Sequence, residues 1–188
     1  MNTFKLFKLL VLPCMILALT ISTQPALAEW AADPDDKRQV KAEKAIEKFR
    51  ERIPRTERYF DEAYGYAILP SVTRVGFGFG GAYGRGIVVE RDEVVGTTGY
   101  WQFSSGIQMG ARNFSMIVFF RDSEALEYFK TREMQFMGQA GLAVATVGIS
   151  GTPAYNEGVA IVTMTRLGLM GEFAATGVKY TYKPLDDK

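Results

Sequence analysis

The chain has 188 residues, 47% of them hydrophobic and 23% charged, and its 22 Lys and Arg nearly balance its 21 Asp and Glu. A net charge of +1 argues against a nucleic-acid-binding protein, which would carry a strongly basic domain. The chain has no histidine and one cysteine, which excludes a Ser-His-Asp triad, a Cys-His pair and a zinc site of the usual nitrogen or sulfur type. An enzyme would have to work with carboxylates, lysine or tyrosine alone, and no spacing identifies a pair of catalytic carboxylates. We therefore expect a non-enzymatic protein with no cofactor and no metal.

Residues 1–28 have the pattern of a secretory signal peptide. Two lysines precede an apolar stretch, Leu9–Ile21, and the run Ala26–Ala28 supplies a small-x-small cleavage pattern. We expect cleavage between Ala28 and Glu29 and a periplasmic or secreted mature protein. The alternative is a lipoprotein acylated at Cys14, which is disfavoured because this cysteine lies inside the apolar stretch.

The rest of the chain, residues 29–188, is expected to form a single domain with two parts. All 19 glycines lie at or after Gly65. Residues 33–63 are rich in charge and are predicted to be helical. Residues 64–183 are punctuated by glycine and are predicted to form a β body.

An amphipathic helix is predicted at the start of this domain. Asp33 is expected to cap it, and Pro54 ends it at about Ile53. One face is apolar and a neighbouring stripe is basic. The apolar face includes Ile46, Phe49 and Ile53, and the basic stripe includes Lys41, Lys44, Lys48 and Arg52. Such a helix can meet anionic headgroups, at about 1 kcal/mol per cation. The alternative is a helix that docks on the body and presents a solvated outer face, because acidic residues form a third stripe.

The β body is predicted to contain many short antiparallel strands. We expect strands at 65–69, 74–81, 84–91, 94–103, 106–113, 115–120, 142–149, 159–165, 169–175 and 178–183, and a short helix near 122–130. Strands at this spacing, with turn residues between them, indicate an antiparallel sheet, a sandwich or a partial barrel. The predicted fold class is therefore α+β, with a mostly antiparallel β body and an N-terminal amphipathic helix.

The segment Val75–Gly86 alternates small residues with larger, mostly aromatic ones. Written as a strand it has one nearly bare face, and glycine weakens a strand unless something approaches its backbone closely. We expect a neighbouring layer against the bare face, so that a bulky residue at Gly78 or Gly80 would destabilise the fold. The segment also matches G-x-G-x-x-G, but strand follows where a dinucleotide site needs a helix.

The aromatic residues of this region have two interpretations. They could fill the core, which is the default, or line a partly open apolar pocket for an acyl chain. The residues concerned are Phe77, Phe79, Tyr83, Tyr100, Trp101 and Phe103.

Several motifs in fixed order resemble the SYLF-domain family. They cover roughly residues 40–182 and comprise Ile53-Pro54, Ala63–Val72, the glycine-rich segment, Tyr100-Trp101, Gly106–Gly110, Ile117–Phe120, Gly168–Gly171 and Gly177. The resemblance implies a lipid-binding module, with phosphoinositides as the usual eukaryotic ligand and actin as a partner of some members. Membrane contact in the family involves an amphipathic N-terminal segment, and the matching segment here is the helix ending at Ile53.

We therefore expect an exported, non-enzymatic module that associates with anionic phospholipid or a membrane surface. The residues expected to bind lipid are Lys41, Lys44, Lys48 and Arg52, together with Ile46, Phe49 and Ile53, which would dock on the body or enter the headgroup region. The alternative is a periplasmic envelope scaffold or protein-interaction module without lipid specificity. Export argues against actin as a partner. The sequence leaves open which lipid binds, and whether a surface is touched or one acyl chain is enclosed.

Overall fold

A computed structural model describes residues 30–131, 135–137, 144–146 and 155–185. The expected signal peptide and its cleavage site lie outside the described residues. Within the described ranges, no helix has both the length and the hydropathy needed to cross a membrane.

The fold is α+β with a β-dominated body, as predicted. The helices are α1 (Lys37–Arg52), α2 (Glu57–Glu62) and α3 (Ser123–Thr131), with a 3-10 turn at Pro54–Thr56. The strands are β1 (Gly65–Glu90), β2 (Glu93–Phe120), β3 (Gln135–Met137), β4 (Val144–Thr146) and β5 (Val159–Pro184). They form one sheet in the order β1-β2-β5-β3, with β4 parallel to β5 and the other pairs antiparallel.

Three long strands make up most of the sheet, so the prediction of many short strands is wrong. β1 has 26 residues, β2 has 28 and β5 has 26. The glycines that suggested strand ends bend the strands instead. Gly78, for example, has a φ of +70° at a shift in the β1–β2 register between Phe77 and Phe79. β1 and β2 are joined by a tight turn in which Arg91 and Asp92 have φ values of 47° and 64°.

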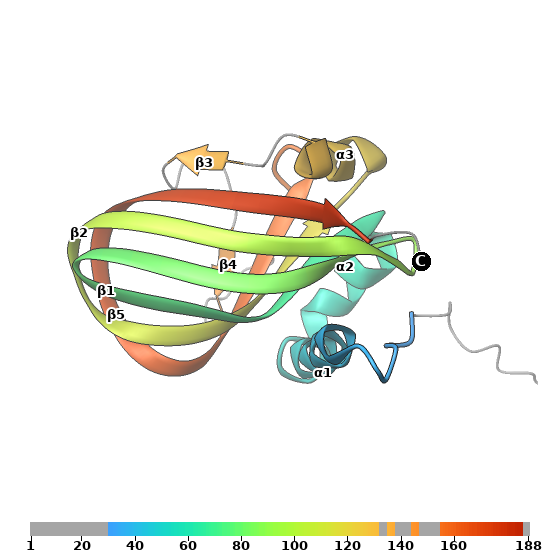
Figure 1. The fold of residues 1–188 in the computed structure, drawn as a ribbon, viewed down its shortest axis with the longest axis horizontal. Helices are drawn as coiled ribbons and strands as arrows, with labels where there is room; N and C mark the ends of the chain where they lie inside the picture. The colour runs from blue at the N-terminus through green and yellow to red at the C-terminus, as the bar shows by residue number, and fades with distance from the viewer. Residues whose placement is uncertain (1–29, 132–134, 138–143, 147–154, 186–188) are drawn as a thin grey trace, which may run out of the picture.

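The long strands curve round at the end away from the helices (Figure 1). This bend brings the second half of β1 against its first half. A Cβ added at Gly84 would lie 3.1 Å from the Ser71 carbonyl oxygen, and one added at Gly86 would lie 3.1 Å from Leu69 Cα. The layer expected against the bare face is therefore present at Gly84, and the same strand supplies it. At Gly78 the expected layer is absent, because an added Cβ would meet nothing within 4 Å.

Two hydrophobic clusters hold the helices against the sheet. One joins α3 to one face through Leu126, Phe129 and partners such as Val118 and Phe120. The other lies under α1 and α2 and includes Ile46, Phe49, Tyr59, Ile117, Phe119 and Trp30. Trp30 is buried there, and its Nε1 donates a hydrogen bond to the Tyr66 hydroxyl at 2.6 Å.

The first helix begins later than predicted. Asp36 caps it by accepting a hydrogen bond from the Arg38 backbone N–H at 2.8 Å. Asp33, the cap predicted from sequence, instead accepts from the Asp35 backbone N–H at 2.9 Å in the turn before α1. The end of the helix is close to the prediction, with Ile53 as the C-cap.

Candidate functional site

The outer surface of the bent sheet exposes a group of large hydrophobic side chains. We call this group the aromatic face: Val75, Phe77, Phe79, Tyr83, Trp101, Phe103, Ile107 and Met109. Phe77 and Ile107 are each 82% exposed, and Phe79 is 69% exposed. Exposed apolar groups that gather in one region mark interaction surfaces more often than scattered ones do.

The alternation of side chains in two paired strands produces this face. Phe77 lies opposite Met109 and Tyr83 lies opposite Trp101 in the β1–β2 register, and directly paired residues share a face. The default prediction that the aromatic residues fill the core is therefore wrong for the members of the aromatic face. It is right for Tyr100, which points to the other side and is only 4% exposed.

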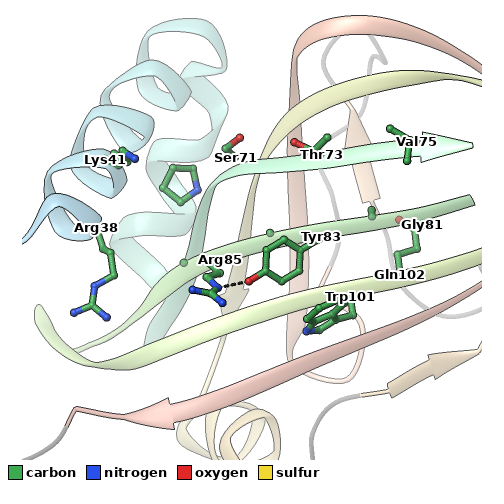
Figure 2. A pocket seen from close by; sticks show the side chains of 14 residues that line it. Arg38, Lys41, Ser71, Thr73, Val75, Gly81, Tyr83, Arg85, Trp101 and Gln102 are labelled. Carbon is green, nitrogen blue, oxygen red and sulfur yellow. Dashed lines mark hydrogen bonds between the residues drawn. The ribbon is translucent and has the colours of Figure 1, made fainter.

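A groove of about 760 Å³ lies between the start of α1 and the outer surface of β1 and β2 (Figure 2). Arg38 and Lys41 of α1 line one side of it, and Arg85 and Tyr83 of β1 line the other, with Trp101 of β2. The groove also adjoins a hollow of about 510 Å³ lined by Phe77, Phe79 and Phe103, with which it shares Val75 and Gly81. A path therefore leads from the cations near α1 to the aromatic face.

Among the described residues that line the groove, three are cations and none is an aspartate or glutamate. Arg38 forms an ion pair with Asp36, in which the Arg38 Nε and Nη2 donate to the two carboxylate oxygens at 3.2 and 3.1 Å. This hydrogen bond is the largest of the effects that raise the pKa of Arg38 and lower the pKa of Asp36. No acidic side chain lining the groove faces Lys41 or Arg85, so the site favours an anion.

Aromatic rings support the third cation. The Arg85 Nε donates a hydrogen bond to the Tyr83 hydroxyl, as Figure 2 shows, and the guanidinium carbon lies 5.6 Å from the centre of the Tyr83 ring. The Tyr83 and Trp101 rings are 4.5 Å apart at an angle of 56°. A guanidinium beside aromatic rings is stabilised by the ring electrons, and the rings offer an apolar surface next to a charge.

A buried arginine, Arg74, and a half-buried one, Arg112, lie on the opposite face of the same strands. Arg74 and Arg112 are direct partners in the β1–β2 register, and Arg74 is 4% exposed. Burial, followed by the charge of Arg112, lowers the pKa of Arg74, and burial raises the pKa of Tyr100 to about 12. With its amide oxygen turned toward Arg74, Gln102 accepts from the guanidinium at 2.8 and 3.2 Å. This network places polar groups beside Tyr100, and one of its members, Gln102, also lines the groove (Figure 2).

The residues predicted to bind lipid are divided between three environments. Lys41 lines the groove, whereas Lys44, Lys48 and Arg52 are exposed on α1 outside the groove lining. Ile46 and Phe49 are buried, with exposed fractions of 2% and 0%, and Ile53 is half-buried beside the same cluster. The sequence left open whether these apolar side chains dock on the β body or enter the headgroup region. In the structure they dock on the β body.

Sequence reasoning did not single out Arg38 or Arg85. Arg85 follows Tyr83 by two residues, so strand alternation alone puts the two side chains on one face. Arg85 and Tyr83 lie near α1 only because of the way in which this helix crosses the bent sheet. No local sequence pattern predicts that crossing. Among the described residues, no group of three or more Asp, Glu, His or Cys side chains is placed to hold a metal ion.

No family model matches the chain. A comparison with curated proteins finds similarity to Beta cell expansion factor A of Aeromonas veronii, with 25% identity over 142 residues. The match covers 74% of this chain and 53% of that protein, so the chain spans about half the length of the relative it matches. The similarity assigns neither a family nor an activity to this chain.

Proposed function

We propose that this protein is an exported, non-enzymatic SYLF-like module that associates with anionic phospholipid at a membrane surface. The observation that carries the proposal is the aromatic face, which continues into a groove lined by cations and by no acidic side chain. A membrane interface offers the matching pair of environments, anionic headgroups above an apolar layer.

The apolar contribution to the binding energy is the larger of the two. Full burial of a large apolar side chain is worth about 1.5–3 kcal/mol, and Phe77, Phe79 and Ile107 are among the most exposed of the hydrophobic residues described. A cation near an anionic surface adds about 1 kcal/mol. Insertion of the aromatic face would therefore provide most of the affinity, and the cations would provide the preference for anionic lipid.

In this proposal α1 holds the cations in place and does not insert. Ile46 and Phe49 fasten the helix to the sheet, which fixes Arg38 and Lys41 at the groove. The exposed Lys44, Lys48 and Arg52 would add long-range attraction that salt screens. The name of the relative, Beta cell expansion factor A, states no ligand and adds no partner to the proposal.

Vesicle co-sedimentation tests this function with a matched pair of variants. Wild-type protein should bind vesicles of mixed phosphatidylglycerol and phosphatidylcholine and bind less as salt rises. Joint replacement Phe77→Ser and Phe79→Ser should weaken binding by about tenfold or more, because two exposed rings no longer insert. The control Tyr128→Ser removes a side chain that is 49% exposed on α3, away from the aromatic face, and should bind like wild type.

Two results would contradict the membrane proposal. One is equal binding to vesicles of phosphatidylcholine alone, which would remove the role of the cations. The other is equal binding by the Phe77/Phe79 variant and wild type, which would remove the role of the aromatic face.

A second candidate function, an envelope scaffold, rests on the edge of the sheet. Among the described strands, β1 is paired only with β2, so its other edge has no strand partner among them. Open edges are templates for strand addition by another chain. This function predicts self-association that rises with protein concentration without lipid, measurable by sedimentation velocity, and indifference to lipid composition.

A further inference from the structure

We propose that the groove between α1 and the sheet binds one long-chain fatty acid as a monomer. Its carboxylate would lie among Arg38, Lys41 and Arg85, and its alkyl chain would run over Tyr83 and Trp101 toward the aromatic face. The inference deepens the proposed function because it uses the same cations, but it requires no membrane.

The polar end of the groove is assembled from two elements. Arg38 and Lys41 are three residues apart on α1 and therefore lie on the same side of the helix, and Arg85 reaches the groove from β1. The three positive charges surround one hollow whose lining contains no acid. Asp36, outside the lining, already pairs with Arg38 through two hydrogen bonds, so Lys41 and Arg85 supply most of the attraction for an anion placed there.

A carboxylate suits these particular cations. Two of the three are arginines, whose planar fork of N–H donors matches the two oxygens of a carboxylate. The Nε and Nη2 of Arg38 already donate to Asp36, so Arg85 is the arginine that offers more of its donors to a ligand. The Arg85 contact with Tyr83 uses Nε, and a guanidinium has five N–H donors in all. A bound carboxylate would thus meet donors from both walls of the groove.

The apolar part of the groove suits one chain. The whole groove has a volume of about 760 Å³, which lies within the range of about 300–1,000 Å³ typical of sites for one small molecule. Trp101 is 54% exposed and Val75 is 55% exposed along this path, and the adjoining hollow adds Phe77 and Phe103. Gly81 also lines the groove, and a Cβ there would make a tight contact of 3.3 Å with the Gln102 carbonyl oxygen of β2.

Tryptophan fluorescence gives a direct readout of this site. The chain has two tryptophans, and Trp30 is 8% exposed whereas Trp101 lines the groove. In a Trp30→Phe background, palmitate below its micelle concentration and without vesicles should shift Trp101 emission to the blue in a saturable manner. Native mass spectrometry should show one palmitate per protein.

Matched charge reversals then locate the carboxylate. Arg85→Glu and Lys41→Glu should each weaken palmitate binding by about tenfold or more, because a repulsive charge replaces an attractive one. Arg55→Glu is the control, an exposed arginine on the 3-10 turn outside the groove lining, and its affinity should stay within about twofold of wild type. Circular dichroism checks that each variant is folded.

The outcomes separate this inference from the proposed function. Absence of a one-to-one palmitate complex, equal binding of the uncharged alcohol of the same chain length, or equal loss in Arg55→Glu and Arg85→Glu would overturn the groove site. Vesicle binding that persists in that case leaves the membrane proposal standing. Palmitate binding without vesicle binding would support the groove and contradict the membrane proposal.

Discussion

Gly84 and Gly86 lie where the two halves of β1 meet, and their missing side chains allow the strand to bend onto itself. At Gly86 an added Cβ would overlap the Ile68 carbonyl oxygen and lie 2.8 Å from its carbon. These neighbours are backbone atoms of the sheet, which cannot move aside as a side-chain tip can. The bend of β1 therefore depends on glycine at this position.

Gly86→Ala should lower the free energy of unfolding by about 2–3 kcal/mol, the cost of forcing an extra methyl group into a packed site. Gly177→Ala is the control, because an added Cβ there meets nothing within 4 Å, and it should change stability by less than about 0.5 kcal/mol. Urea denaturation followed by circular dichroism measures both. Equal midpoints for the two variants would show that the halves of β1 are not in close contact.

At the residue scale, the sequence predicts which side chains share a face but not which face is covered. The alternation around Phe77, Phe79 and Tyr83 follows from strand geometry. Whether that face is buried depends on which distant segment packs against it, and β1 turns its small residues inward where its own first half arrives. At Gly78 the packing reason for the predicted destabilisation fails, since an added Cβ would meet nothing within 4 Å. A φ of +70° still strains any other residue there, so glycine is required at this position by backbone conformation and not by a neighbouring layer.

At the scale of elements, α1 is predictable as a helix but its partner is not. Helical spacing puts Ile46 and Phe49 on one face, and the same pattern serves a helix that docks on protein or on lipid. In the structure, this face of α1 packs against Phe119 and Ile117 of β2, so the helix docks on protein. Docking then determines which cations reach the groove. Lys41 lines it, whereas Lys44 and Lys48 lie outside its lining.

An ion pair fastens the third helix to the first strand. Lys130 Nζ of α3 lies 2.6 Å from Glu90 Oε2 at the end of β1, and both side chains are mostly buried. The hydrogen bond from Lys130 is the largest effect on Glu90 and lowers the pKa of its carboxyl below the ordinary value of 4.5. Because the folded-state pKa is the lower one, the ionised carboxylate stabilises the fold above the unfolded-state pKa. That stability is lost as the pH falls through the folded-state pKa.

Glu90→Gln should therefore lower the free energy of unfolding by about 1–2 kcal/mol at neutral pH. The difference from wild type should shrink as the pH falls below 4.5. Glu127→Gln is the control, since Glu127 also contacts Lys130, at 3.0 Å, but is 60% exposed, and it should cost less than about 0.5 kcal/mol. Urea titrations at a series of pH values measure both variants. A Glu90→Gln deficit that does not change with pH would assign the effect to packing and not to charge.

At the scale of the whole molecule, the helices and the bend of the sheet lie at opposite ends of the long strands. The helices gather at one end of the strands, and the strands curve at the other (Figure 1). The α1 groove lies between them and opens toward the aromatic face. The α+β class follows from the division between a glycine-free helical segment and a glycine-rich body. The bend itself does not, because it depends on contacts between residues far apart in the chain.

Quenching of Trp101 fluorescence by brominated lipid measures whether the aromatic face touches the membrane. In the Trp30→Phe variant Trp101 is the sole tryptophan, so its fluorescence reports on this face alone. Vesicles that contain phosphatidylglycerol and phospholipids brominated near the headgroup end of the acyl chains should quench Trp101, and brominated vesicles of phosphatidylcholine alone should quench it much less. Unquenched Trp101 on protein that co-sediments with the anionic vesicles would contradict the account, because binding would then use another surface.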